Sequence, residues 1–396
     1  MSVSRLVLVT RRFWPLVGGA ESVAANFGAE LCARGHLHCV LTARWQSSWP
    51  AEIEHRSARV IRLAQPAWRR LGTWRYMNAL KRWLEAHLDR FDLVYVSMLK
   101  HSAYATLGAA RKGRFPVVLR AEGAGLTGDV HWQLEASFGR RIKHRCMRAD
   151  AIVAPSTAIE AELIAAGYRR DRIHLIPNGV PIPSPRDATA IEQARRALAE
   201  SNPQLHLPRG GRLVVYTGRL HEAKGLTTLI DAWQKVHAHH PDDRLWIVGE
   251  GPMCEALAQQ IDDLQLAAGI VLAGPFDTVE DVLRAADVYV LSSKEEGMSI
   301  ALLEAMATGL PIVASDIPGN RALVEDEIHG LLTPPDDAGA LARAIERLLG
   351  EPDFAARLGE HARDRACREF SIARMVESHL RLFDRLLDST SQGASN

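Results

Sequence analysis

The chain has 396 residues, which is long for one domain and ordinary for two. Its apolar fraction of 47% and charged fraction of 24% are those of an ordinary soluble globular protein, and no run of about 18 apolar residues predicts a membrane-spanning helix. The first residues, MSVSRLVLVT, enter a strand at once and do not have the long apolar core of a signal peptide. Five cysteines without a CxxC pair favour reduced thiols over a disulfide or zinc framework, so we expect a cytoplasmic protein.

The net charge of +1 conceals a strong asymmetry between the two halves of the chain. Residues 1–180 contain 27 Lys and Arg against 14 Asp and Glu, a balance of +13. Residues 181–396 contain 21 against 33, a balance of −12. Because such a split bears on partners rather than on fold, the first half is expected to bind something anionic.

Strand and helix patterns alternate along the first half of the chain. The apolar segment RLVLVT (5–10) is followed by a loop, a helical pattern and a second apolar segment, LHCVLTA (37–43). Further segments of this kind are FDLVYVSM (91–98), PVVLRAE (116–122) and AIVAPST (151–157). Continuous apolar strands that alternate with helices are typical of a parallel sheet covered on both faces, so residues 1–180 are predicted to form a doubly wound α/β domain.

The stretch 67–90, AWRRLGTWRYMNALKRWLEAHLDR, leaves two interpretations open. It interleaves lysines and arginines with the aromatic residues Trp68, Trp74, Tyr76 and Trp83. One interpretation is an amphipathic core helix with a basic outer face. The other is a surface that docks on an anionic membrane or holds a pyrophosphate-bearing acceptor.

A proline-rich segment separates the halves, since IPNGVPIPSPRDA (176–188) carries four prolines, and residues 181–210 are assigned to a linker. The segment RLVVYT (212–217) then opens a second alternation of strands and helices, which predicts another α/β domain over residues 211–370. Its further strands are RLWIVGEG (244–251), GIVLAGPF (269–276), DVYVLSS (287–293) and PIVASD (311–316). A last helix is expected over about 371–388 within a final segment 371–390, and residues 389–396 are expected to form a frayed tail.

Open parallel sheets bind ligands at the carboxyl ends of their strands, so the loops there are the expected place for chemistry. In the loop after the first strand, GGAE (18–21) brings backbone amides at Gly18 and Gly19 to a helix start, which favours an anion unless the segment is a plain tight turn. After the first strand of the second domain, GRLHEAKG (218–225) carries Arg219 and Lys224. These two cations suit a diphosphate, unless the loop is only a solvated surface.

The segment EEGMSIALLEAMATG (295–309) places two carboxylates, Glu296 and Glu304, around the expected start of a helix. The amides of Gly297, Met298 and Ser299 lie at the positive end of that helix, where they can bind phosphate or hydroxyl oxygens. Two carboxylates that flank an anion site are suited to the hydroxyls on either side of a diphosphate, such as those of a sugar and a ribose. The competing interpretation is a surface helix with two solvated acids.

The segment EEGMSIALLEAMATGLPIVAS resembles the E-x7-E motif of glycosyltransferase family 4, whose members are retaining enzymes of the GT-B fold. GRLHEAKG, VGGAE, IPNGV and IVGEGP are similar to further motifs of that family, in the same order over nearly the whole chain. The resemblance implies two Rossmann-like domains that face each other across a cleft, with a final helix crossing back to the first domain. It also implies a nucleotide-diphospho-sugar donor held mainly by the second domain, an acceptor held mainly by the first, and no metal or other cofactor.

Matched by position, the resemblance implies a role for each motif residue. Glu296 would contact the hydroxyls of the donor sugar, and Glu304 would contact the ribose. Arg219 and Lys224 would stabilise the departing diphosphate. The remaining donor-binding positions are backbone groups and glycines of the same motifs: Gly18, Gly19, Gly249, Gly297, Met298 and Ser299.

One position departs from the family pattern. Many members have a histidine near the transferred sugar, after the fourth-strand region of the first domain, whereas this chain reads PVVLRAEGAG and has Glu122 at about that place. The nearest histidine is His131, in GDVHW. Either Glu122 contacts the sugar instead, or His131 reaches in, or no such group is needed.

The sequence therefore predicts a retaining glycosyltransferase of hexosyltransferase type. Its acceptor is expected to be a lipid-linked or otherwise anionic saccharide in surface polysaccharide synthesis, with peripheral association at the inner face of the membrane and no nucleic-acid partner. Two alternatives stay open: a nucleotide-sugar epimerase or hydrolase of the same fold, and a catalytically silent nucleotide-sugar-binding module. A dinucleotide oxidoreductase is disfavoured because neither half has GxGxxG after its first strand.

Overall fold

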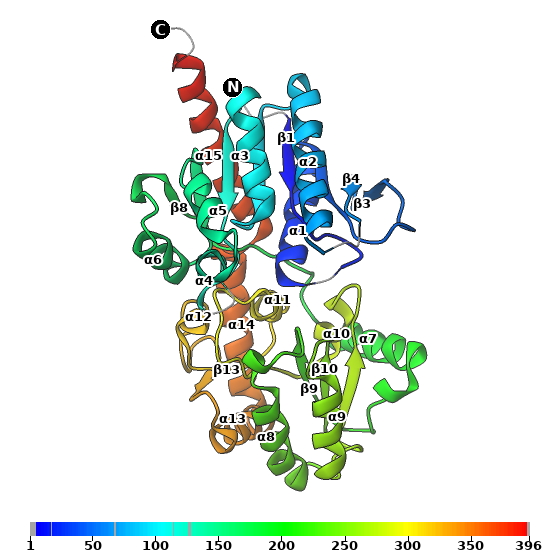
Figure 1. Cartoon of the computed structure of the whole chain (residues 1–396). Helices are drawn as coiled ribbons and strands as arrows, with labels where there is room; N and C mark the ends of the chain where they lie inside the picture. The colour runs from blue at the N-terminus through cyan, green and yellow to red at the C-terminus, as the bar shows by residue number, and fades with distance from the viewer. Residues whose placement is uncertain (1–4, 17, 67–68, 114, 126–127, 394–396) are drawn as a thin grey trace. The chain divides into compact units, whose positions relative to one another are not determined.

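The structure, a computed structural model, describes residues 5–16, 18–66, 69–113, 115–125 and 128–393 (Figure 1). The chain divides into two compact units. Unit 1 comprises Met1–Gly179 and Ile372–Asn396, and unit 2 comprises Val180–Ser371. Among the described residues, no helix is both long and apolar enough to cross a membrane.

The described part of unit 1 contains one mixed sheet. Its strands are β1 (Leu6–Val9), β2 (Leu37–Arg44), β3 (Glu52–His55), β4 (Ala58–Ala64), β5 (Leu93–Ser97), β6 (Val117–Arg120), β7 (Ala151–Ala154) and β8 (Ile173–Leu175). They lie in the order β3-β4-β2-β1-β5-β6-β7-β8, and all neighbours are parallel except β3, which pairs antiparallel with β4 at one edge. The apolar segments predicted this parallel sheet, but the β3–β4 hairpin escaped prediction because the edge strand β3 has no buried residue to mark it.

Helices cover both faces of the sheet in unit 1. They are α1 (Gly19–Ala33), α2 (Arg69–Ala86), α3 (His101–Gly113), α4 (Asp129–Glu135), α5 (Gly139–Cys146), α6 (Thr157–Ala165) and α15 (Ile372–Gly393). Alternate strand residues such as Val7 and Val94 form one buried cluster with side chains of α2, α3 and α5. On α15, drawn red in Figure 1, His379 packs on Phe27 of α1 with ring centroids 4.7 Å apart, so the last helix belongs to this unit.

Two predictions about helices of unit 1 change in the structure. The predicted frayed tail is wrong for residues 389–393, because α15 continues to Gly393. Within the stretch 67–90, Arg69–Ala86 form α2 and Leu88–Arg90 form a 3-10 turn. Tyr76 is buried among core residues while Trp74 is 58% exposed. Trp83 is partly buried and stacks on His87, and Trp68 lies outside the described residues. The helix therefore has both a core face and an exposed aromatic residue.

The described part of unit 2 contains a fully parallel sheet. Its strands are β9 (Leu213–Thr217), β10 (Arg244–Val248), β11 (Ile270–Gly274), β12 (Val288–Leu291), β13 (Ile312–Ser315) and β14 (Leu331–Thr333). They lie in the order β11-β10-β9-β12-β13-β14. The strands are mostly apolar and buried, except that the edge strand β11 is largely half-buried, and Trp233 and Trp246 are fully buried in this unit.

Eight described helices surround the sheet of unit 2. They are α7 (Ala188–Ser201), α8 (Leu226–His239), α9 (Cys254–Asp263), α10 (Glu280–Ala285), α11 (Ile300–Thr308), α12 (Pro318–Arg321), α13 (Ala338–Gly350) and α14 (Pro352–Glu369). The segment 181–210, assigned to a linker from its prolines, contains α7 and is part of this unit. Arg195 of α7 donates to the carbonyl oxygen of Ala285 and pairs with Asp287 at 2.6 Å, which fastens the segment to the sheet.

Candidate functional site

The carboxyl edge of the sheet in unit 2 brings Lys224 and Glu296 together. Lys224 Nζ lies 2.6 Å from Glu296 Oε1, and Ser293 Oγ donates to the same oxygen at 2.7 Å. The two charged side chains are 24% and 10% exposed, so the pair is accessible but partly shielded from water. The loop after β9 and the loop after β12 thus join at a single carboxylate.

Close backbone packing holds these two loops in register. Ser292 Oγ donates to the carbonyl oxygen of Lys224 at 2.9 Å. A Cβ added to Gly225, whose φ is +61°, would lie 2.2 Å from the carbonyl oxygen of Ser292. A Cβ added to Gly319 would lie equally close to the carbonyl oxygen of Glu296. Sequence reasoning missed the supporting roles of Ser293 and Gly319, and the only signal for Gly319 is its place in the turn PGN after a strand.

Helix α11 begins beside Glu296, as its sequence predicts. Ser299 is its N-cap and accepts a hydrogen bond from the amide of Leu302, while Gly309 ends the helix at φ +79°. Gly297 and Met298 form the partly exposed approach to this N-terminus. Their amides and the helix dipole make the position favourable for an anion.

Glu296 and Glu304 both lie close enough to Tyr289 for their charges to affect its pKa. Tyr289 of β12 is buried, and its phenol has a pKa raised by burial and further by the charges of Glu304 and Glu296. Glu304 itself is partly buried on α11. The spacing in sequence therefore does place both carboxylates around the carboxyl end of β12.

Arg219 and Gly249 lie on adjoining loops with different surroundings. Arg219 is exposed, and it forms no ion pair with any residue in the described part of the chain. Gly249 has φ +142°, and an added Cβ would lie 1.9 Å from the carbonyl oxygen of Gly218. Gly249 is therefore required for the packing of one loop on the other, and its predicted contact with the donor stays a prediction.

In unit 1, Gly18 and Gly19 lie at the start of α1 as predicted, with Gly18 as the N-cap. The carboxylate of Glu21, in the first turn, occupies the space next to Gly18, where an added Cβ would lie 2.4 Å from Glu21 Oε2. Arg12 Nε pairs with Glu21 at 2.8 Å. A phosphate at this helix start would have to share it with that carboxylate, so the predicted phosphate contact stays a prediction.

Glu122 follows β6 and lies in a buried group of polar side chains. Ser97 Oγ donates to its Oε1 at 2.7 Å, and Arg120 Nη2 lies 3.4 Å from its Oε2. The backbone amide of Glu122 donates to Asp129 Oδ2 at 2.9 Å. Burial raises the pKa of Glu122 to about 7, and the nearby Arg120 charge offsets only part of that effect.

The group around Glu122 extends to the last helix of unit 1. Arg120, only 2% exposed, donates to Asn178 Oδ1 and also bonds to Tyr95, whose hydroxyl lies 3.1 Å from His379 Nε2 of α15. His131 lies on α4 and is partly exposed. From the segment GDVHW it is Asp129 that contacts Glu122. Sequence reasoning missed all three: Arg120 and Asp129 stand in no motif, and Asn178, although part of IPNGV, was given no role there.

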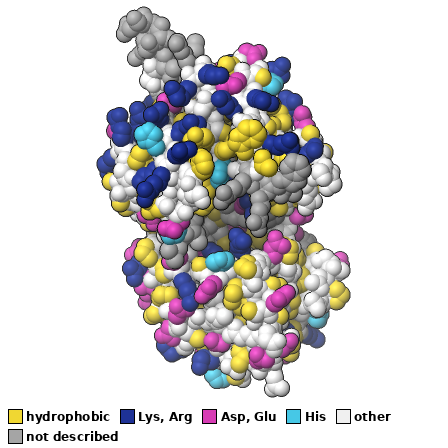
Figure 2. Space-filling view, viewed as in Figure 1, with side chains coloured by type: hydrophobic (Ala, Val, Ile, Leu, Met, Phe, Trp, Pro, Cys, Tyr) yellow, Lys and Arg dark blue, Asp and Glu magenta, His cyan; other side chains and the backbone are white. Residues whose placement is uncertain are grey.

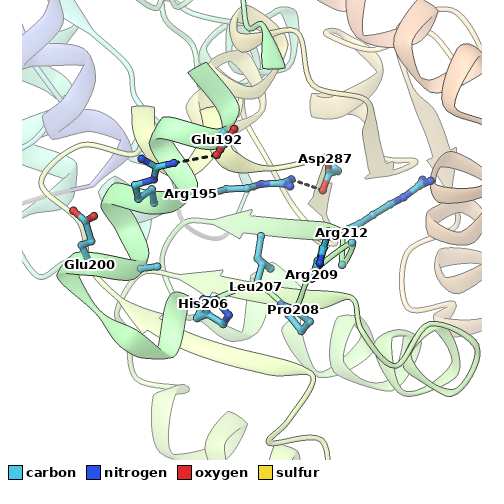
Figure 3. Close-up of a pocket in the computed structure, with 13 residues that line it drawn as sticks. Glu192, Arg195, Glu200, His206, Leu207, Pro208, Arg209, Arg212 and Asp287 are labelled. Atoms are coloured by element: carbon cyan, nitrogen blue, oxygen red, sulfur yellow. Dashed lines mark hydrogen bonds and ion pairs between the residues drawn. The ribbon is translucent and has the colours of Figure 1, made fainter. Parts of the chain in front are cut away.

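Unit 2 has a further hollow of about 840 Å³ at the opposite, amino edge of its sheet (Figure 3). Arg212 and Asp287, which precede β9 and β12, line it together with residues of α7. The charges there are largely matched, because Arg195 pairs with Asp287 and Arg196 pairs with Glu192 at 3.0 Å. This hollow is separate from the loops that carry the predicted donor residues.

No group of three or more His, Cys, Asp or Glu side chains that could hold a metal ion occurs within the described ranges.

Comparison with known sequences identifies the family. Residues 17–182 match the family model described as Glycosyltransferase Family 4, and residues 211–351 match the one described as Glycosyl transferases group 1. The chain belongs to glycosyltransferase family 4. The two matches fall one in each unit and include every motif on which the resemblance was based.

Individual relatives of this family 4 chain are about 30% identical to it, over little more than half of its length. The lipopolysaccharide core biosynthesis glycosyltransferase LpsE of Rhizobium meliloti is 28% identical over 233 residues, which are 59% of this chain and 64% of the relative. The putative glycosyltransferase EpsD of Bacillus subtilis is 31% identical over 58% of each chain. The UDP-Gal:alpha-D-GlcNAc-diphosphoundecaprenol alpha-1,3-galactosyltransferase of Escherichia coli is 31% identical over 52% of each. The chain thus spans between half and two thirds of the length of these curated relatives.

Solved structures show the fold over the whole chain. Sucrose-phosphate synthase from Thermosynechococcus elongatus has a TM-score of 0.81 at 24% identity, with 98% of this chain and 100% of that chain covered. Anabaena Alr3699/HepE in complex with UDP and glucose has a TM-score of 0.78 at 20% identity, with 96% and 100% covered. The predicted fold class, a GT-B protein built from two doubly wound parallel-sheet domains, is confirmed.

Proposed function

We propose that this chain transfers a sugar from a nucleotide-diphospho-sugar to a saccharide acceptor, with retention of the anomeric configuration. The observation that carries the proposal is the Lys224–Glu296 pair, 2.6 Å apart, beside the N-terminus of α11. A cation and a carboxylate held at an anion-binding helix start suit the diphosphate and the hydroxyls of one donor molecule. The family to which the chain belongs supports the same reading.

The proposed transfer depends on charge that develops on the leaving group. The bond between the anomeric carbon and the diphosphate oxygen breaks, and negative charge collects on the diphosphate. Arg219 and Lys224 stabilise that charge more strongly in the transition state than in the bound donor. The acceptor oxygen forms the new bond on the same face of the sugar, and its proton passes to the departing diphosphate. Protein cations supply the electrostatic stabilisation, so we propose a reaction that uses no metal.

Other residues at the edge of unit 2 orient the donor in this proposal. Glu296 accepts hydrogen bonds from hydroxyls of the donor sugar, and Glu304 accepts them from the ribose. The amides of residues 297–299 donate to the sugar and the diphosphate. HepE was crystallised with UDP-glucose and one relative is named for a UDP-Gal donor, so uridine diphosphate sugars are the first donors to test.

Unit 1 is proposed to bind the acceptor, with Glu122 as a hydrogen-bond acceptor for a hydroxyl of the reacting saccharide. Relatives named for lipopolysaccharide core synthesis and for a diphosphoundecaprenol-linked sugar support a surface polysaccharide precursor as that acceptor. Lysines and arginines are abundant on the face of unit 1 seen in Figure 2, in keeping with its sequence balance of +13. We propose that this basic surface associates with an anionic membrane at its inner face.

The experiment that tests the donor proposal is a thermal-shift screen against uridine, guanosine and adenosine diphosphates. A ligand at 100 times its dissociation constant stabilises the folded state by roughly 2.7 kcal/mol. One nucleotide should raise the melting temperature clearly, and the matching nucleotide sugars should then be turned over only when an acceptor is present. Turnover without any acceptor would instead favour a hydrolase or epimerase, and no shift with any nucleotide would remove the proposal.

A further inference from the structure

Arg11 in unit 1 is an arginine held in place by neutral side chains. It follows β1, and its guanidinium donates through Nε to Gln65 Oε1 at 3.1 Å and through Nη2 to Thr73 Oγ1 at 2.8 Å. Nη1 lies 3.4 Å from His101 Nδ1. The guanidinium carbon also lies over the ring of Trp45, 5.2 Å from its centroid. Four separate segments of the chain therefore fix the direction of this one cation.

No carboxylate compensates the charge of Arg11 among the residues that the structure describes. Burial lowers its pKa, and the only group that acts in the opposite direction is the Tyr76 phenol. Its sequence neighbour Arg12 pairs with Glu21 at 2.8 Å, and Arg59 pairs with Glu52 at 2.6 Å. A partly buried cation without a counter-ion costs free energy, because hydrogen bonds to neutral groups replace its lost hydration only in part.

The surroundings of Arg11 offer further hydrogen-bond donors. A guanidinium has five N–H groups and no acceptor, so three contacts leave donors free. Because Arg11 donates to His101 Nδ1, the ring proton of neutral His101 is on Nε2. Burial, with the charges of Arg11 and Lys100, lowers the pKa of His101 to about 4, which keeps the ring neutral at physiological pH. The aromatic ring of Trp132 lies beside His101, with centroids 5.2 Å apart.

We infer that Arg11, together with Thr73 and His101, binds an oxyanion, either a phosphate or a carboxylate. This inference rests on the proposed function, in which unit 1 holds the acceptor, and makes that acceptor an anionic saccharide. The strand that Arg11 follows, β1, and the strand that Glu122 follows, β6, both flank β5. Two inter-strand spacings separate their ends by about 10 Å, the length of one or two sugar units. The oxyanion would therefore lie close to the reacting sugar along the acceptor.

The test measures the affinity of three probes by calorimetry: inorganic phosphate, glucuronate and neutral glucose. Wild type, Arg11→Gln and Arg11→Lys are compared, with Arg59→Gln as a matched control because Arg59 is an exposed arginine of the same unit with its own carboxylate. Saturating uridine diphosphate is present so that the donor residues are occupied. At least one anionic probe should bind wild type and lose roughly 10- to 150-fold in affinity in Arg11→Gln. Arg59→Gln should bind as wild type does.

The two anionic probes distinguish a phosphate-bearing acceptor from an acidic sugar. Arg11→Lys keeps the positive charge but loses the planar set of guanidinium donors, so its affinity for the anion should fall between those of wild type and Arg11→Gln. If Arg11→Gln does not fold, the comparison of wild type with Arg11→Lys is sufficient. Equal affinity of wild type and both Arg11 variants for both anions would overturn the inference. Binding of uridine diphosphate is read separately: its loss in all proteins would reject the proposed donor, whereas Arg11-dependent anion binding would persist.

Discussion

The two sheets share a parallel core, but the charged side chains at their carboxyl edges are arranged differently. In unit 2 the central carboxylate, Glu296, is matched directly by Lys224 and Ser293. In unit 1 the corresponding edge keeps Glu122 buried with a raised pKa, and it leaves Arg11 without a carboxylate partner. The Lys224–Glu296 pair in unit 2 is therefore electrostatically balanced without ligand, while Arg11 in unit 1 has a charge that an added anion can compensate.

This contrast has a chemical meaning within the proposed function. In the proposed function the donor diphosphate is bound in unit 2, where two short motifs contribute the paired lysine and glutamate. An acceptor differs from enzyme to enzyme, and recognition then depends on side chains drawn from several loops. Five experiments can break or sharpen the comparison.

The largest effect is expected from removing the two cations of unit 2. Lys224→Ala and Arg219→Ala should each slow transfer by roughly 10- to 150-fold, because each removes a charge-assisted contact to the leaving diphosphate. The double variant should lose less than the product of the two, since both cations act on the same group. Turnover is measured with and without a chelator, and Lys235→Ala, at an exposed position of α8, is the control. Full activity of either single variant, or loss of wild-type activity with chelator, would contradict this account.

The next effect concerns the buried acid of unit 1. Glu122→Gln should lower turnover by about 10-fold or more while nucleotide diphosphate affinity stays unchanged, because a neutral amide with one acceptor oxygen replaces the charged acceptor for the saccharide. With a pKa of about 7, Glu122 ionises as pH rises through neutrality, so wild-type turnover should rise there and the variant should show no such step. Glu135→Gln, at an exposed position of the same unit, is the control.

The same variant has an opposite expected effect on stability. The folded pKa of Glu122 is above its ordinary value of 4.5, so the unfolded chain loses its proton first as pH rises. Wild type should therefore lose stability relative to Glu122→Gln between about pH 4.5 and 7, and the difference should stay constant above that. Denaturant unfolding at several pH values measures this. A pH-independent difference would show that the carboxyl is not held protonated.

A different kind of effect, on folding rather than catalysis, tests the role of Gly249. Gly249→Ala should lower the free energy of unfolding by about 2–5 kcal/mol, because φ is +142° and the new Cβ would lie 1.9 Å from the Gly218 carbonyl oxygen. Gly350→Ala is the matched control, since a Cβ there meets no atom within 4 Å. If Gly249→Ala kept its stability and lost only nucleotide affinity, the glycine would serve the donor rather than the loop packing.

The smallest effect expected is membrane association of unit 1. Each lysine or arginine near an anionic leaflet contributes about 1 kcal/mol, and the exposed Leu71 and Trp74 of α2 add apolar contact. Vesicle sedimentation should recover more protein with anionic than with neutral lipid, and added salt should reduce the difference. If equal amounts of protein sedimented with both lipids, membrane association would be rejected, and the basic surface would be assigned to binding a soluble anionic acceptor.

The sequence by itself determined the features that depend on neighbouring residues. Continuous apolar strands and their alternation with helices predicted two parallel α/β domains, and the short motifs identified the family. The start of α11 at Ser299 and its end at Gly309 could be predicted because caps are local: a hydroxyl serves an amide three residues away, and only glycine adopts the terminal φ easily. Lys224 and Glu296 could each be placed in advance at the carboxyl end of a strand, whereas their direct contact appears only in the structure.

Only the tertiary structure decided which residues surround Glu122 and Arg11. Asp129 joins Glu122 directly, and Asn178 joins it through Arg120, while Gln65, Thr73 and His101 join Arg11. Neither periodicity nor the presence of a motif indicates these contacts. The β3–β4 hairpin and the place of α7 in unit 2 were equally hidden, because they depend on an edge strand with no buried face and on contacts of Arg195 with a distant segment. The physical reason is common to all of them: burial and counter-charge are properties of a packed neighbourhood, and that neighbourhood exists only after the strands have been ordered in the sheet.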